Sequence, residues 1–331
     1  MTNFHSTARV QRRARTGARA ALVWLALLPG LAAADVSLYQ ASVPLKGGTE
    51  ADRAAGFGEA LRVAAVRASG RRDAGANPTI ASAAADPSRY VQQYSVTPDH
   101  LLKVGFDGRA VEQLLQQAGL PLWPAERPVT LVQLFVPSVA GGARAVLASE
   151  RPPERDQLER AAQVRGLPIA WPQQPVDLAA ARARLAAPGA AAQGVLVGVA
   201  SGAGIDWSFA QLDTRTQGRG PAATGADLAA DALAARYAPG STRGVGNVSV
   251  RIGAVNDLAA YAALLEYLQS LSLVRGVAVE QVTGDTVQLG LALRGDLELL
   301  RRVAALDTHL QVGAKGDAAS GSTGTDFTWQ P

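Results

Sequence analysis

Two breaks rich in proline and glycine divide the chain into three groups of short, patterned segments. Pro121, Pro124 and Pro128 surround the first break, and Pro239-Gly240 marks the second. Proline interrupts helices and is excluded from central strands, so regular structure cannot run through either break. The sequence therefore predicts a mixed α+β and α/β protein built from three small modules. These span residues 35–122, 127–240 and 247–331.

The first module shows the order strand, helix, helix, strand, strand, helix. Residues 36–45 alternate between polar and apolar types, as a half-buried strand does. Thr49 and Asp52 have the spacing of a capping box at a helix start, and Gly70 is a typical terminator. The other elements are expected over 78–85, 90–96, 100–106 and 108–119. This order is typical of an α+β sandwich.

Helical and strand patterns alternate in the second module. Residues 129–136 form the continuous apolar run of a buried strand. A hairpin is predicted from 195–200 to 205–213, across Ser201 to Gly204. Helices are expected over 154–165, 177–186 and 224–237, with a short strand over 167–171. The alternation predicts a small α/β layer structure.

The third module is predicted to be ferredoxin-like, with the order βαββα plus closing strands. We expect Asn256 to cap a helix and Gly284-Asp285 to turn a hairpin. Phe327 and Trp329 are expected to dock on the sheet as a closing strand. The flexible loop before them is predicted over 314–325, which has no large apolar residue. One face of the helix is expected to point inward through Leu258, Tyr261, Leu264, Leu265 and Leu268.

Residues 1–34 have the three parts of a cleavable signal peptide. Five arginines and no acidic residue precede an apolar core over 20–28, and a Pro-Gly break follows. Ala32 and Ala34 fit signal peptidase, which predicts cleavage before Asp35. An uncleaved anchor is the alternative, although the core is shorter than a membrane span. Arg12-Arg13 lacks the hydrophobic pair of a twin-arginine signal, so the general secretory route is favoured.

Charge and cysteine content limit the function of the exported chain. The whole chain has 32 basic and 28 acidic residues, but removing the five leader arginines leaves one more acidic than basic residue. Electrostatics therefore give no reason to expect binding to nucleic acid. The absence of cysteine excludes disulfides, thiol catalysis, cysteine metal sites and a lipid anchor on cysteine. These features predict a periplasmic protein with no membrane span after cleavage.

Several runs of residues resemble the bacterial exported family called domain of unknown function 2066. The resemblance implies an envelope protein of proteobacterial type, and it implies no particular activity. The runs are Arg53 to Phe57, Glu59 to Leu61, Arg67 to Asp73, Asn77-Pro78, Tyr90 to Tyr94, Val104 to Asp107, Gly119 to Trp123, Arg127-Pro128 and Val277 to Arg294.

No catalytic, cofactor or metal motif is predicted. The two histidines after the leader, His100 and His309, lack a second ligand at metal spacing. Ser201 is not in a nucleophile elbow. Gly198, Gly202 and Gly204 lack the lysine and hydroxyl of a phosphate loop. These glycines are therefore interpreted as turn residues.

A few residues are candidates for contact with a partner. They lie at the ends of predicted elements or in a linker, where loops can present side chains. The alternative interpretation is solvated surface charge for the polar residues and core packing for the tryptophan. The candidates are Arg71, Arg72, Asp73, Arg89, Tyr90 and Trp123.

The sequence favours a non-enzymatic interaction or accessory protein of the cell envelope, whose partner is an unknown envelope protein. No small-molecule ligand is indicated. The alternative is a cryptic envelope hydrolase, or a glycan- or lipid-binding protein. Paired carboxylates could serve such a hydrolase, and Asp73, Asp86 and Asp99 cluster along the chain.

Overall fold

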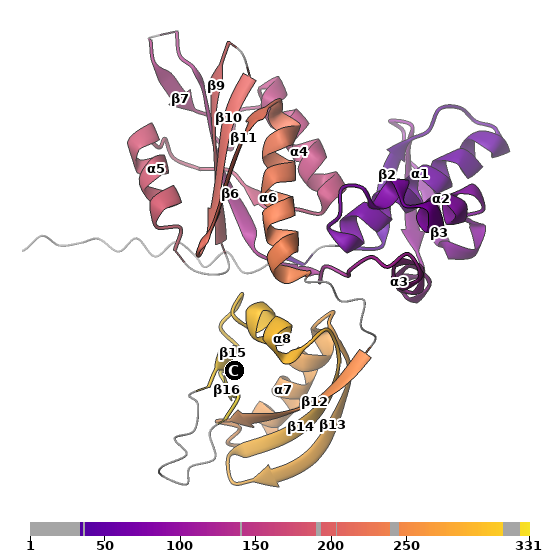
Figure 1. The fold of residues 1–331 in the computed structure, drawn as a ribbon, viewed down its shortest axis with the longest axis vertical. Helices are drawn as coiled ribbons and strands as arrows, with labels where there is room; N and C mark the ends of the chain where they lie inside the picture. The colour runs from indigo at the N-terminus through magenta and orange to yellow at the C-terminus, as the bar shows by residue number, and fades with distance from the viewer. Residues whose placement is uncertain are drawn as a thin grey trace, which may run out of the picture. The chain divides into compact units, whose positions relative to one another are not determined.

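The computed structural model describes residues 34–35, 37–139, 141–189, 193–202, 204–238, 245–313 and 325–331. Helices and strands are mixed along this part of the chain (Figure 1), which confirms the predicted fold class. Residues 1–33 of the predicted leader and residues 314–324 of the predicted loop lie outside it. Within the described residues, no helix has the length and apolar character needed to cross a membrane. The predicted module boundaries stay predictions.

The first module is built on a three-stranded antiparallel sheet with the order β2-β4-β3. The capping box predicted at Thr49 and Asp52 is present at the start of α1, and Gly70 ends that helix in the left-handed region, at φ +69°. The predicted order of elements is confirmed. The strands are β2 (Gln40–Pro44), β3 (Val91–Val96) and β4 (Leu101–Phe106), and the helices are α1 (Glu50–Ser69), α2 (Pro78–Ala85) and α3 (Gly108–Gln117).

The second module contains a six-stranded sheet between helices. Its order is β11-β10-β9-β6-β7, with β8 also paired to β6. Figure 1 shows α5 on one face and α4 and α6 on the other. The strands are β6 (Val129–Pro137), β7 (Ala143–Ala145), β8 (Ile169–Ala170), β9 (Gln193–Ser201), β10 (Gly204–Gln211) and β11 (Thr214–Gly220). The helices are α4 (Pro153–Arg165), α5 (Leu178–Ala186) and α6 (Ala222–Tyr237).

Two features of this sheet differ from the sequence prediction. The strands β7 and β11 were not predicted, because neither contains a large apolar residue. Gly198 is not a turn residue, since β9 runs through it. A Cβ atom at Gly198 would lie 2.4 Å from the Trp207 ring, so this glycine makes room for the tryptophan in the next strand.

The third module has a five-stranded sheet with the order β13-β14-β12-β16-β15. Without β16 this is the ferredoxin-like order, in which β15 is the fourth strand. The strand β16 lies between β12 and β15, parallel to β12 and antiparallel to β15. Phe327 and Trp329 are buried, which agrees with the prediction that they dock on the sheet as a closing strand. The strands are β12 (Val245–Gly253), β13 (Val274–Thr283), β14 (Thr286–Arg294), β15 (Leu310–Val312) and β16 (Phe327–Trp329), and the helices are α7 (Leu258–Ser270) and α8 (Leu297–Ala304).

The start of α7 corrects two predictions. Asp257, not Asn256, is the cap, and its carboxylate accepts from the Ala260 amide at 2.7 Å. A carboxylate suits this position because it also interacts with the positive end of the helix dipole. Leu258 therefore becomes the first helical residue, and it is 80% exposed instead of facing the core.

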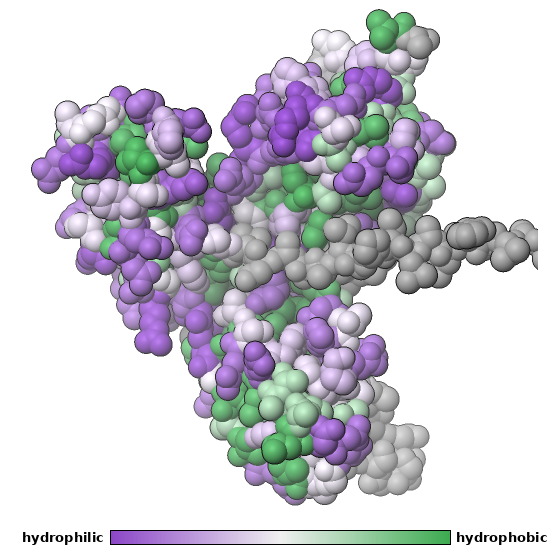
Figure 2. Space-filling model, turned by 180° about the vertical axis from the view of Figure 1, so that it is seen from behind, coloured by the Kyte–Doolittle hydropathy of each residue, from purple (hydrophilic) through white to green (hydrophobic). Residues whose placement is uncertain are grey.

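The edge strand β13 also carries exposed apolar residues, Val279 and Val282. Figure 2 shows hydrophobic residues gathered on the visible face of the third module. The pairing of β13 with β14 shifts register twice, between Val274 and Gly276 and between Val279 and Gln281. Such bulges interrupt an edge and disfavour the addition of another strand.

A short antiparallel pair joins β1 (Ala34–Asp35) to β5 (Glu126–Arg127). The predicted cleavage point before Asp35 lies inside β1. Ala34 pairs with Arg127, and Asp35 pairs with Glu126. Residues inside the first proline-rich break therefore pair with the beginning of the described chain.

Candidate functional site

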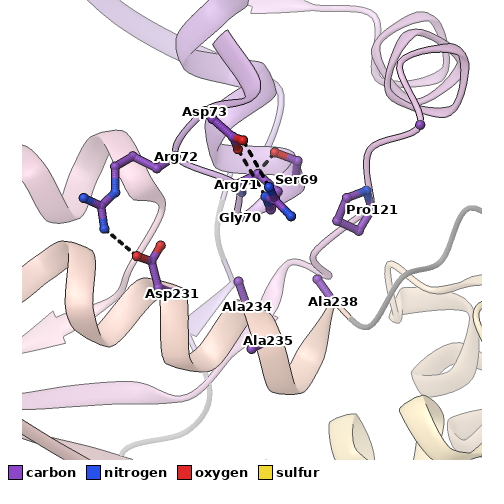
Figure 3. Close-up of a pocket in the computed structure, with 11 residues that line it drawn as sticks. Ser69, Gly70, Arg71, Arg72, Asp73, Pro121, Asp231, Ala234, Ala235 and Ala238 are labelled. Carbon is purple, nitrogen blue, oxygen red and sulfur yellow. Dashed lines mark hydrogen bonds and ion pairs between the residues drawn. The ribbon is translucent and has the colours of Figure 1, made fainter. Parts of the chain in front are cut away.

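A cavity of about 810 Å³ lies between the end of α1 and the last turns of α6. We call it the α1–α6 groove (Figure 3). Its size is within the range of about 300–1,000 Å³ that ligand pockets occupy. Its lining residues are Ser69, Gly70, Arg71, Arg72, Asp73, Gly119, Pro121, Asp231, Ala234, Ala235 and Ala238.

Small residues form the floor of the groove. The left-handed conformation of Gly70 ends α1 beside α6. A Cβ atom at Gly70 would lie 2.6 Å from the Ala234 Cβ and 2.8 Å from the Trp123 ring. The backbone at the end of α1 therefore lies against α6 without a side chain between them.

This close approach gives a testable stability difference between two glycines of the groove. Gly119 also has a positive φ, +67°, but nothing lies within 4 Å of its Cβ position. Gly119→Ala is expected to cost only the left-handed strain of about 1–2 kcal/mol. Gly70→Ala should cost about 1–3 kcal/mol more, because α6 or Trp123 must move. Chemical denaturation checks this order, and equal losses for the two variants would contradict the packing described here.

The charged residues on the rim of the groove are already paired. The Arg71 guanidinium donates to both carboxylate oxygens of Asp73, at 3.1 and 3.0 Å. Arg72 donates to Asp231 at 2.5 Å and lies 3.7 Å from Asp227. Figure 3 shows both the Arg71–Asp73 and the Arg72–Asp231 pairs on the rim.

Arg165 forms ion pairs with the same two aspartates from the buried side. Its side chain is only 3% exposed, and it donates to Asp227 and Asp231, each at 2.5 Å. It also donates to the Gly70 carbonyl at 2.9 Å. The two carboxylates are one turn apart on α6, so one guanidinium can reach both of them. Arg165 therefore fixes the end of α1 to α6.

A second buried arginine, Arg127, connects several backbone segments beneath the groove. It has no exposed surface, and its guanidinium lies 3.7 Å from the centre of the Trp123 ring. Burial holds the pKa of Arg127 well below its ordinary value, and the nearby Arg67 adds to this effect. Its five hydrogen bonds go to the carbonyls of Arg67, Trp123, Pro124, Arg165 and Gly166.

The paired charges suit binding better than acid–base catalysis. The hydrogen bond from Arg71 lowers the pKa of Asp73, whereas a general acid at neutral pH needs a raised pKa. Asp231 already accepts from Arg72 and Arg165. Over the described ranges, no group of three histidine, cysteine or acidic residues could hold a metal ion.

The structure brings together three of the six candidate residues, since Arg71, Arg72 and Asp73 all line the α1–α6 groove. Trp123 is fully buried and lies against Gly70 under the floor. Arg89 lines a different cavity, of about 570 Å³. Tyr90 is 4% exposed and lies under the Arg89 guanidinium.

The three acidic residues considered for hydrolysis do not share a cavity in the described part of the chain. Asp73 lines the α1–α6 groove, and Asp86 lines the cavity of Arg89. Asp99 lies in the turn between β3 and β4. No observation therefore favours their acting as a catalytic pair.

Sequence reasoning missed the half of the groove that α6 supplies. Asp227 and Asp231 have i, i+4 spacing, and Ala234, Ala235 and Ala238 follow one turn later. This spacing places both acids on one helix face. Their arginine partners are far away in the chain, and no local pattern identifies them.

Comparison with known families gives a match in the first module. The family model described as "Domain of unknown function (DUF8605)" matches residues 32–124, which include the sheet and helices of the first module. The match supports an uncharacterised domain in this part of the chain. No curated protein and no solved structure matches the chain.

Proposed function

We propose that this protein is a non-enzymatic accessory protein of the cell envelope, which binds a segment of a partner protein in the α1–α6 groove. The observation that supports this most is a floor of small residues bordered by side chains that are already ion-paired. Such a surface is shaped before binding, so a partner orders few side chains of the groove when it docks.

The rim indicates what kind of segment fits. It offers two arginines and two aspartates, so a strongly acidic or strongly basic segment has no net attraction to it. The floor of alanine, glycine and proline lets a backbone approach closely. We therefore expect a segment with small apolar residues in the middle and one or two charges of each sign at its ends.

The groove can be tested at Ala235, an exposed residue of its lining. A photo-crosslinking amino acid at position 235 should give one discrete adduct in living cells. The same group at Ala183, an exposed alanine of α5 on the opposite face of the sheet, should give none. Crosslinked peptides identify the partner and the segment that it contributes.

Binding measurements with the purified partner then test the proposal. Ala235→Trp is expected to weaken its binding at least about tenfold, because the indole fills the groove. Ala183→Trp is the matched control and should leave binding unchanged. Equal affinities of the two variants for the captured partner would reject the groove as its binding site.

Export to the periplasm is part of the same proposal, together with the resemblance to the exported family called domain of unknown function 2066. The leader pattern of residues 1–34 supports it. Mass spectrometry of the protein from a periplasmic fraction is expected to show a new amino terminus at or near Asp35. A species that retains Met1 and stays in the cytoplasm would contradict export.

A further inference from the structure

A second cavity, of about 430 Å³, lies away from the α1–α6 groove and shares no lining residue with it. We call it the Glu112 cavity. It is bordered by residues 37–40 at the start of β2, by β3 and β4, by α3, by Ala125, and by Ser272 and Arg275 at the start of β13. The polar side chains of its lining are Ser37, Tyr39, Gln40, Gln92, Gln93, Glu112, Ser272 and Arg275.

Glu112 is a buried carboxylate held by three donors. Its side chain is 6% exposed, and it accepts hydrogen bonds from the Tyr39 hydroxyl and from Arg275. Arg294 lies 3.0 Å from its second oxygen. Burial and the neighbouring carboxylate raise the pKa of Tyr39, which therefore stays a neutral donor. The position of the Arg275 guanidinium is thus set by a rigid, fully bonded acid.

The cluster has one positive charge that the carboxylate does not neutralise. Two guanidinium groups, those of Arg275 and Arg294, face one carboxylate. No other charged side chain lines the cavity among the described residues. Glu126 does not line it, and its carboxylate accepts from the amide and the hydroxyl of Ser272, at 2.6 and 2.7 Å.

Arg275 presents this charge to the cavity. Its side chain is 34% exposed, compared with 20% for Arg294, and it is the arginine in the lining. A guanidinium has five N–H donors, and in the described part of the chain Glu112 is the acceptor found for Arg275. The remaining donors are therefore available to a ligand. A planar donor fork of this kind matches a carboxylate.

We propose that the Glu112 cavity binds the carboxylate at the carboxyl terminus of a short peptide. Arg275 would pair with the carboxylate. The exposed amides of Gln92 and Gln93 supply donors and acceptors that match the adjacent peptide bond. This site is separate from the α1–α6 groove and does not depend on the function proposed for it.

Calorimetric titration of the full chain tests the site. The two probes are acetyl-Ala-Ala-Ala with a free carboxyl terminus and the same peptide as its amide. The free acid should bind at least about tenfold more tightly than the amide, since a hydrogen bond to a charged group is involved. Arg275→Gln should remove this preference. Arg89→Gln, at an exposed arginine of another cavity, should retain it.

Further measurements separate the alternatives. Competition by acetate as strong as by the tripeptide would contradict recognition of a peptide, because Gln92 and Gln93 would then contribute nothing. If Arg275→Gln fails to fold, Arg275→Lys is the substitute. It should keep the charge and lose most of the preference for the free acid, because a lysine ammonium lacks the planar N–H donors of a guanidinium. Ala235→Trp changes the α1–α6 groove and should leave tripeptide binding unchanged. Failure of the groove proposal can therefore be told apart from failure of this one. Equal binding of acid and amide, or no saturation by about 10 mM, would overturn the proposal.

Discussion

Replacing Arg127 with alanine is expected to lower the free energy of unfolding by at least about 4 kcal/mol. The side chain has no exposed surface, and all five of its N–H donors are used on backbone carbonyls. Alanine would leave those carbonyls without a donor and a cavity beside the Trp123 ring. Each lost hydrogen bond lowers the stability, because a buried carbonyl cannot replace it with a hydrogen bond to water.

Two variants make the measurement interpretable. Arg127→Lys keeps the charge but cannot reach five carbonyls, so it should lie between wild type and Arg127→Ala. Arg71→Ala removes an arginine whose side chain is 58% exposed, and it should cost about 1 kcal/mol or less. Urea unfolding of the three variants gives the comparison. An Arg127→Ala loss as small as that of Arg71→Ala would mean that the carbonyl network stabilises little.

Deleting residues 326–331 is expected to unfold the third module. The deletion removes β16, whose Phe327 and Trp329 are 0% and 4% exposed. Truncation of one buried aromatic residue costs about 3–5 kcal/mol, so loss of both approaches the whole stability of a small module. Hydrogen exchange should show loss of protection in β12 and β15, the two strands that pair with β16.

The matched control lies in the neighbouring strand. Val312 of β15 is 53% exposed, so Val312→Ala should change stability by about 0.5 kcal/mol or less. Phe327→Ala alone should be intermediate between this control and the full deletion. If the deletion leaves protection of β12 intact, then β16 only covers a core that is stable without it.

Strongly patterned segments were predictable from the sequence alone. The helix α2 was predicted at its observed bounds, and Gly284-Asp285 was predicted to turn the hairpin that β13 and β14 form. The strand β11 was missed because its sequence, TRTQGRG, has no apolar alternation. It is a strand because its backbone pairs with β10 at the edge of the sheet, and backbone pairing leaves no signal in side-chain pattern.

Half of the α1–α6 groove was predictable, and the other half was not. Arg71, Arg72 and Asp73 stand out because they directly follow a helix-ending glycine. Asp231, the partner of Arg72, is 159 residues away in the chain, and this pairing depends on how α6 packs against the end of α1. The position of Arg275 beside Glu112, 163 residues away, is equally non-local. Single-sequence patterns report local periodicity and contain no information about such pairs.

The position of β16 inside the five-stranded sheet has a consequence for the order of folding. Arg251 at the end of β12 donates its backbone amide to Asp326, 75 residues later in the chain. A strand at the edge of a sheet can join last, but this one separates β12 from β15. The strands β12 and β15 cannot form their native pairing with β16 until residues 327–329 are available, and long loops slow such closure. A chain that emerges amino terminus first, from a ribosome or through a translocation channel, must therefore hold this sheet open until residues 327–329 have emerged.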